Sequence, residues 1–157
     1  MSFDVLTKKK YVEVFVNRVS NSVDLPLPTY ATSQSAGVDL MADITTDITI
    51  KPGDVAVVPT GIAIQIPANY EAQIRSRSGI AFKHSVIVLN SPATIDADYR
   101  GELKIILKNL GKNDFIISRG MRIAQLLVKE VPTIKFILKD SLSSSERGDK
   151  GFGSTGL

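Results

Sequence analysis

Cysteine is absent from this sequence of 157 residues. Its absence excludes a disulfide framework, a thiolate nucleophile and a cysteine-based zinc site. Histidine is nearly absent too, with His84 as the single example. No motif marks His84 as part of a serine–histidine–aspartate triad, so we interpret it as structural. A chain without cysteine fits a reducing compartment, and we expect a cytoplasmic location.

Long apolar runs and a strong net charge are also missing. No stretch approaches the roughly 18 apolar residues of a membrane-spanning helix, and no apolar run follows residues 8–10 as in a signal peptide. We therefore expect a soluble protein with no membrane partner. The net charge is only +3. Because no basic stripe with interleaved aromatic residues accompanies it, we expect no nucleic-acid partner.

What the sequence does contain is the alternation of apolar and polar residues that is typical of β-strands. Turn sequences such as Pro52-Gly53 separate the alternating stretches. Many short strands with little helix predict an all-β fold, a jelly-roll-like β-sandwich or barrel. One short helical turn is expected at residues 78–84. Strands are expected at residues 12–17, 46–50, 55–58, 62–66, 70–75, 86–89, 103–107, 114–117, 123–130 and 133–138.

The C-terminal part has a different composition. Residues 139–146 are rich in serine, which is typical of a flexible linker. We therefore divide the chain into a β domain of residues 1–138 and a flexible C-terminal arm of residues 139–157. The arm ends in "RGDKGFGSTGL". This ending is a frayed terminus, an adhesion tripeptide at residues 147–149, or a flap that becomes ordered over a ligand.

Four further segments interrupt the strand pattern with polar residues: "SAGVDLMAD", "RSRSGIAFKHSV", "NSPATIDADYRGE" and "RGMRIAQL". With the arm they make five segments, whose order, content and spacing resemble the five motifs of the trimeric dUTPases. The resemblance runs from about residue 28 to the C-terminus. It implies an enzyme that hydrolyses dUTP to dUMP and pyrophosphate by attack of water at the α-phosphorus. Such an enzyme limits uracil incorporation into DNA and supplies dUMP for thymidylate synthesis.

The third segment carries two carboxylates, Asp96 and Asp98. If the segment is extended, their side chains point to opposite faces, so only one of them faces a pocket. Taken alone, both are ordinary surface carboxylates beside a turn, and Tyr99 is an ordinary half-buried strand residue. The resemblance instead implies that Asp96 is the catalytic general base. It also implies that the ring of Tyr99 packs against the deoxyribose and leaves no room for a 2′-hydroxyl group.

The resemblance assigns substrate binding to further residues of the third segment and to residues of the second and fourth, which on their own would be turn, cap and sheet-edge residues. Asn90 and the following turn to Thr94 and Ile95 would recognise uracil, because an amide and backbone groups offer both donors and acceptors. The triphosphate would contact Arg77, Ser78, Gly79 and Gln125. Asp39 would support the site through an arginine network.

In the arm, the resemblance implies a catalytic role for Arg147 and substrate contacts from Phe152, Gly153, Ser154 and Thr155. Lys150 stands where the family has glycine, and would be strained if that position needs a positive φ. The family also implies Mg²⁺ bound through phosphates and waters without a direct protein ligand. It further implies a homotrimer that binds dUTP and dUMP in sites shared between subunits.

Two other functions compete with this interpretation. The dCTP deaminases share the fold, but they need a glutamate five residues after the glycine of the third segment. Here that glycine is Gly101, and Ile106 stands at the required distance. A catalytically inactive, dUTPase-like binding protein is the second alternative, and the joint presence of Ser78, Asp96 and Gln125 argues against it.

Overall fold

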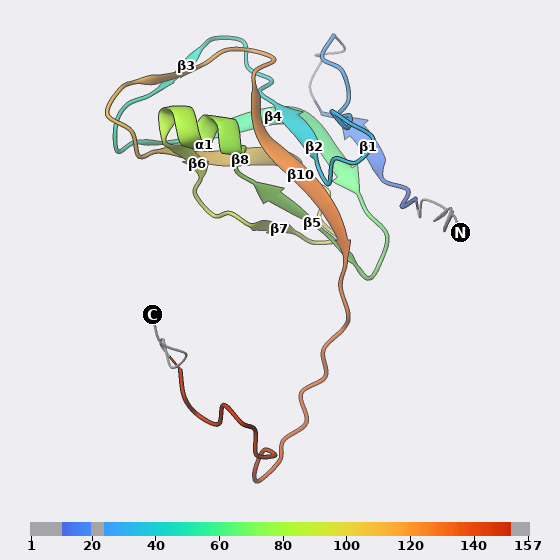
Figure 1. The fold of residues 1–157 in the computed structure, drawn as a ribbon. Coiled ribbons are helices and arrows are strands. Elements are labelled where there is room, and N and C mark those ends of the chain that lie inside the picture. Colours follow the sequence, from blue (N-terminus) through green and yellow to red (C-terminus); the bar gives the residue numbers. More distant parts are fainter. Residues whose placement is uncertain (1–10, 20–23, 152–157) are drawn as a thin grey trace, which may run out of the picture.

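The computed structural model describes residues 11–19 and 24–151 and shows an all-β protein with one short helix. Every strand pair in it is antiparallel. Two four-stranded sheets face each other, and a two-stranded ribbon extends from one end (Figure 1). This arrangement confirms the predicted jelly-roll-like β fold.

The first sheet has the order β1-β4-β8-β6 and the second the order β2-β10-β5-β7, while β3 and β9 form the ribbon. Neighbours in each sheet are far apart in sequence, so non-local pairing builds the fold. The bounds are β1 Phe15–Arg18, β2 Val38–Met41, β3 Ile48–Ile50, β4 Val55–Gln65, β5 Tyr70–Arg75, α1 Ser78–His84, β6 Val86–Val88, β7 Ala93–Ile95, β8 Glu102–Asn109, β9 Phe115–Ile117 and β10 Arg122–Glu130.

The core lies between the two sheets, and strict alternation along the strands fills it. In β8, Leu103, Ile105 and Leu107 are buried and the residues between them are more exposed. In β5, Ala72 and Ile74 are buried from the opposite sheet. Because side chains in a strand alternate between faces, each sheet contributes one apolar face to a shared core.

A bulge in β4 interrupts its pairing with β8. The register shifts between Pro59 and Ala63, and Gly61 adopts φ +70°, a conformation that favours glycine. Inside the bulge, the Thr60 hydroxyl donates to the carbonyl oxygen of Leu103 at 2.7 Å. The bulge therefore ties the middle of β4 to the start of β8.

The predicted helical turn is confirmed with the expected bounds. Arg77 is extended just before α1, and Ser85 ends the helix in the left-handed conformation with φ 56°. Ile80 is the buried residue of α1 and fixes the helix to the core. This attachment leaves the first residues of the helix, Ser78 and Gly79, at the edge of a pocket.

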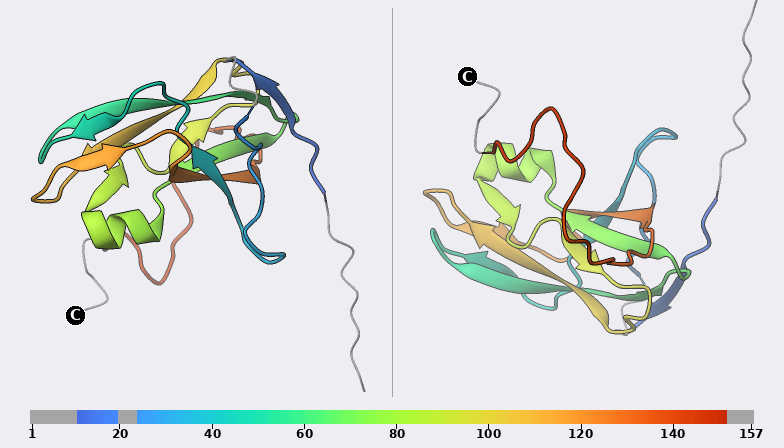
Figure 2. Two further views of the ribbon diagram at one scale, coloured as in Figure 1. Left: turned by 90° about the horizontal axis from the view of Figure 1, so that it is seen from above. Right: turned by 90° about the horizontal axis from the view of Figure 1, so that it is seen from below.

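The strands predicted at residues 55–58 and 62–66 are parts of one strand, β4. The structure corrects three further expectations about strands. Residues 133–138 form no strand; the chain leaves the sheets after β10 and runs away from them (Figure 1), so that it overlaps the sheets when the molecule is seen from below (Figure 2). The apolar alternation there is real, but no strand in the described part of the chain pairs with it. Conversely, β2 and β7 lie in segments that the sequence presents only as polar interruptions.

The third correction concerns the carboxylate segment. Extended geometry ends at Asp96, because residues 97 and 98 form a turn in which the N–H of Tyr99 donates to the Asp96 carbonyl at 3.1 Å. Asp96 and Asp98 are therefore separated by a turn and not by strand alternation. As for membrane spans, the described residues contain no helix long and apolar enough to cross a bilayer.

Asn109 is a polar residue of the core whose bonds predict a measurable contribution to stability. Its Nδ2 donates to the carbonyls of Ile50 and Asn113 at 2.8 and 2.9 Å, and its Oδ1 accepts from Gly111 at 2.8 Å. We expect Asn109→Asp to reduce the free energy of unfolding by about 2–4 kcal/mol, because a carboxylate would face two carbonyl oxygens. Urea unfolding followed by circular dichroism measures the change.

The matched control is Asn113→Asp, since the side chain of Asn113 is exposed. We expect this variant to unfold within about 0.5 kcal/mol of the wild type. Equal stability of the two variants would contradict a structural role for the Asn109 amide.

Candidate functional site

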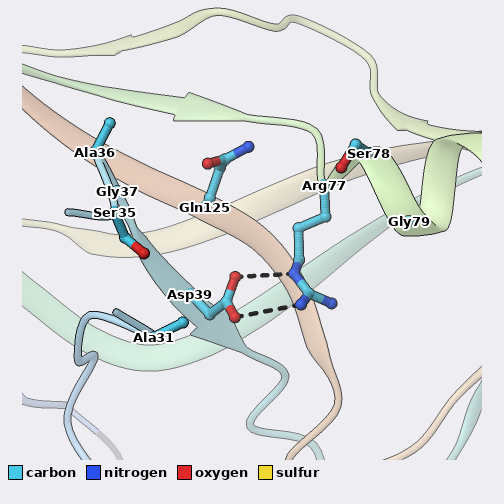
Figure 3. A pocket seen from close by; sticks show the side chains of 9 residues that line it. All are labelled: Ala31, Ser35, Ala36, Gly37, Asp39, Arg77, Ser78, Gly79 and Gln125. Atoms are coloured by element: carbon cyan, nitrogen blue, oxygen red, sulfur yellow. Dashed lines mark hydrogen bonds and ion pairs between the residues drawn. The ribbon is translucent and has the colours of Figure 1, made fainter. Parts of the chain in front are cut away.

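A pocket of about 330 Å³ lies where β2, β10 and the start of α1 meet. Polar side chains surround it, and Figure 3 shows Asp39 paired with Arg77 on one side and Gln125 and Ser78 around the remaining space. The lining residues are Ala31, Ser35, Ala36, Gly37, Asp39, Arg77, Ser78, Gly79 and Gln125. We call this the arginine pocket. It brings together the four residues that the resemblance assigns to the triphosphate, Arg77, Ser78, Gly79 and Gln125, with Asp39, to which the resemblance assigns a supporting role.

Two arginines hold Asp39 in the arginine pocket. Arg77 donates from Nε and Nη2 to the two oxygens of Asp39 at 2.8 and 3.3 Å, a forked geometry that fixes both groups. Arg122 donates from Nη1 to Asp39 Oδ2 at 3.3 Å. Arg77 also donates to the carbonyl of Arg122 at 3.0 Å, which closes the network.

The sequence analysis missed Arg122 as a member of this network. Its place in "RIAQ", three residues before Gln125, was a usable signal. Strand pairing makes the contact, because β10 and β2 are neighbours and Arg122 pairs with Met41, two residues beyond Asp39. Two guanidinium groups and one carboxylate leave an excess of one positive charge at the edge of the pocket.

Gln125 owes its position to strand register. It lies opposite Asp39 on β2 and opposite Arg75 on β5. A register shift between Arg122 and Ala124 inserts an extra residue in β10, so that consecutive Ile123 and Ala124 are both buried. The Gln125 amide then donates to the carbonyl of Ser76 at 2.9 Å and stays at the pocket surface.

These groups make the arginine pocket suitable for an anion. The Arg77 guanidinium, two serine residues and the side-chain amide of Gln125 line a space of about 330 Å³. The helix α1 begins there, and no side chain of the described residues caps its first N–H groups. The carboxylate of Asp39 is already neutralised by its arginine partners, so it opposes an incoming anion only weakly.

Asp96 lines a different pocket, of about 280 Å³, which we call the tyrosine pocket. Its lining consists of Thr94, Ile95, Asp96, Tyr99, Glu102, Leu103 and Lys104. The side chain of Asp96 is exposed there, beside the ring of Tyr99. An exposed carboxylate next to an aromatic face can orient a water molecule near a bound ligand. In the described part of the chain, the two pockets have no lining residue in common.

The structure thus divides the predicted site residues into groups. Asp39, Arg77, Ser78, Gly79 and Gln125 gather in the arginine pocket, and Thr94, Ile95, Asp96 and Tyr99 gather in the tyrosine pocket.

The remaining predicted residues lie elsewhere. Asn90 lies in the exposed turn after β6 and lines neither pocket. Arg147 lies on the arm, where its Nε donates to the carbonyl of Lys150 at 2.9 Å. Lys150 has no positive φ, so the strain considered for a lysine at this position is not present. Phe152, Gly153, Ser154 and Thr155 lie outside the described residues.

Comparison with known proteins identifies the family. The dUTPase family model matches residues 24–156. A deoxyuridine 5′-triphosphate nucleotidohydrolase of Orientia tsutsugamushi (strain Ikeda) is 58% identical over 131 residues, 83% of this chain and 88% of that protein. The chain belongs to the dUTPase family. The enzyme of the same name from Caldanaerobacter subterraneus subsp. tengcongensis is 49% identical over 142 residues, 90% and 96% of the two chains.

Solved structures agree with this assignment. The Staphylococcus bacteriophage 80alpha dUTPase with dUPNHPP has a TM-score of 0.83 and 27% identity, covering 92% of this chain and 99% of the phage chain. A mutant dUTPase from phage phi11 of S. aureus, in which a structural Mg(II) ion is coordinated, shares the fold with a TM-score of 0.75 and 22% identity, over 84% of this chain and 99% of its own. The protein is thus a dUTP diphosphatase that hydrolyses dUTP.

The arginine pocket generates a prediction about phosphate binding. We expect Gln125→Glu to lower kcat/KM for dUTP by roughly ten- to a hundredfold, because a carboxylate would face the triphosphate. Steady-state kinetics of pyrophosphate release measures the effect. Gln65→Glu introduces the same charge at the exposed end of β4 and should leave kcat/KM unchanged. Equal losses in both variants would mean that the effect comes from net charge and not from the pocket.

Proposed function

We propose that the enzyme cleaves dUTP at the α-phosphorus, with the nucleoside in a tyrosine pocket and the triphosphate in an arginine pocket. The observation that carries this proposal is that Asp96 and Tyr99 line one pocket, whereas Arg77, Ser78 and Gln125 line another. A base that activates water must stand beside the reacting phosphorus without being neutralised by the phosphate-binding groups. The products would be dUMP and pyrophosphate, which limits uracil incorporation into DNA and supplies dUMP for thymidylate synthesis.

In the tyrosine pocket, each residue would have one role. Asp96 would accept a proton from the attacking water as general base. The ring of Tyr99 would lie against the deoxyribose and exclude a 2′-hydroxyl. Thr94 and Ile95, on β7, would align the uracil ring with Asn90. The amide of Asn90 offers both a donor and an acceptor, so it can pair with the edge of uracil that presents acceptors and a donor. Such pairing would leave cytosine with unpaired groups.

In the arginine pocket, Arg77, Ser78, Gly79 and Gln125 would bind the phosphates, and Asp39 would hold the Arg77 guanidinium in a fixed orientation. The arm would complete the site. Arg147, Ser154 and Thr155 would bind the outer phosphates and stabilise the negative charge that develops on them. Phe152 and Gly153 would cover the uracil. Closure of such a flap would exclude water other than the attacking molecule.

Mg²⁺ would arrive with the triphosphate. In the described part of the chain, no group of three or more histidine, aspartate and glutamate residues is arranged to hold a metal ion. Among the described residues that line the arginine pocket, Asp39 is the only carboxylate, and it is already paired with Arg77 and Arg122. This donor set fits an ion held by phosphate oxygens and water, and the ion would neutralise charge on the phosphates.

A homotrimer would bring the two pockets together. Within one chain, Asp96 and the arginine pocket belong to separate cavities, so a substrate that needs both would bind between subunits. The segment after β10 supports association, because the alternating Ile134, Phe136 and Leu138 are 72%, 90% and 98% exposed. Such a segment suits addition as a strand to a neighbouring sheet. The predicted strand at residues 133–138 would then form only in the assembly.

Asp96→Asn tests the proposed reaction. The amide keeps the size of the side chain but cannot take a proton, so we expect kcat for dUTP to fall by about a hundredfold or more while dUTP still binds. Pyrophosphate release gives the rate, and calorimetry with a non-hydrolysable analogue gives the affinity. Asp98→Asn, in the same exposed turn, is the control and should keep the wild-type rate.

A panel of dUTP, dCTP, dTTP and UTP completes this test. The proposal requires that wild type release pyrophosphate from dUTP and discriminate against the other three. Full activity of Asp96→Asn would refute the role of the carboxylate. Binding of dUTP by wild type without any hydrolysis would favour an inactive binding protein.

The exposed segment after β10 gives a test of assembly. We expect wild type to have three times the 17.0 kDa mass of the chain in light scattering. The double variant Ile134→Asp, Phe136→Asp should dissociate, because two charges would be buried in the expected interface. Thr133→Asp, on the other face of the predicted strand, is the control. A monomeric wild type would contradict the trimer.

Two further expectations remain predictions: the cytoplasmic location and the domain boundary at residue 138.

A further inference from the structure

Tyr99 is held in an unusual way that the proposed role of its ring does not explain. Its hydroxyl donates to the carbonyl oxygen of Glu102 at 3.0 Å, so the side chain bends back along its own chain across Gly101. A tyrosine against a sugar needs only its flat face. The hydrogen bond of the hydroxyl therefore fixes the orientation of the ring.

Gly101 provides the space for this conformation. A Cβ atom built at Gly101 would lie 2.6 Å from Cζ of Tyr99 and 3.0 Å from Cε2, and it would collide with the hydroxyl oxygen. The backbone of Gly101 does not need glycine for its own sake, because its φ lies outside the left-handed region. The glycine is therefore required by the ring that crosses it and not by the turn.

Glu102, the residue whose carbonyl accepts from the hydroxyl, also contacts β4. The N–H of Gly61, in the β4 bulge, donates to Oε1 of Glu102 at 3.0 Å. The neighbouring hydroxyl of Thr60 donates to the carbonyl of Leu103 at 2.7 Å. The Gly61 bond thus holds the side chain of Glu102 and the Thr60 bond holds the backbone of Leu103, next to the Glu102 carbonyl that accepts from the Tyr99 hydroxyl. Glu102 is also within 3.7 Å of the Lys104 ammonium.

We infer that Gly101 and Glu102 are positioning residues that aim the ring of Tyr99 and thereby set the discrimination between deoxyribose and ribose. Gly101 supplies clearance and Glu102 supplies an anchor that the β4 bulge holds in place. The inference rests on the proposed function, in which the ring of Tyr99 excludes a 2′-hydroxyl. It extends that function to two residues that act through the ring of Tyr99.

Steric exclusion depends on position at the scale of one atom. A hydroxyl group needs about 3 Å of space, so a ring that moves by roughly an ångström can admit it. Misplacements of that size change rates by about a hundredfold in enzyme sites. An alanine at position 101 would force a shift of this order, because a Cβ contact with Cζ at 2.6 Å must lengthen.

Gly101→Ala is the central test, and the readout is the ratio of kcat/KM for dUTP to kcat/KM for UTP. We expect the ratio to fall by roughly ten- to a hundredfold. Tyr99→Phe keeps the ring and removes the hydrogen bond, and its ratio should fall by about three- to tenfold. Asp98→Ala, in the same turn, should keep the wild-type ratio.

A double-mutant cycle separates the ring from a general effect on folding. If Gly101→Ala acts through the ring, then it should change neither the ratio nor the thermal midpoint in a Tyr99→Ala background, where no ring is left to displace. This comparison remains decisive if Gly101→Ala alone folds poorly: recovery of folding in the double variant supports the inference. An unchanged ratio in Gly101→Ala, or equal damage in both backgrounds, overturns it.

Failure of the proposed function would look different. If wild type accepts UTP as well as dUTP, or if Tyr99→Ala keeps the wild-type ratio, the ring does not select the sugar and the proposed role of Tyr99 fails. If Tyr99→Ala loses discrimination but Gly101→Ala retains it, the role of Tyr99 stands and the inference about Gly101 and Glu102 is wrong.

Discussion

The register of β10 between β2 and β5 is the constraint on which the arginine pocket depends. Gln125 lies opposite Asp39 on one side and Arg75 on the other, so three polar residues distant in sequence share one level of the sheet. A slip of one residue would turn Gln125 into the core and Leu126 into the pocket. The apolar side chains of β10 oppose such a slip, since Ile123, Ala124 and Leu126 are all buried.

The charged groups of that pocket follow from this register. Asp39 stands between Arg77, the residue just before α1, and Arg122, the first residue of β10. Side chains with 21%, 27% and 54% exposure are partly screened by water, so the pairs contribute more to orientation than to stability. Orientation is what an anion site requires, because donors that are already in place need no rearrangement when the phosphate arrives.

The tyrosine pocket depends on a second irregularity, the bulge in β4. A regular β4 would pair with β8 throughout, and the N–H of Gly61 and the hydroxyl of Thr60 would have other partners. The bulge instead directs both groups at residues 102 and 103. Both pockets therefore form beside a strand that departs from ideal pairing. Bulges are common next to active sites in β proteins.

Alternation along the chain determined the all-β fold, most of the strands and the core faces of β5 and β8, because the side-chain period of a strand can be read directly from apolar spacing. The polar motifs determined the family and the candidate residues, including the helix from Ser78 to His84. Tertiary structure decided which of those residues meet, since Asp39, Arg77 and Gln125 come together only through strand pairing. It also placed Asp96 in a separate pocket, revealed Arg122, and gave residues 133–138 no strand partner within the described part of the chain. Apolar alternation indicates which face of a segment can be buried, but it does not identify the strand that pairs with that segment.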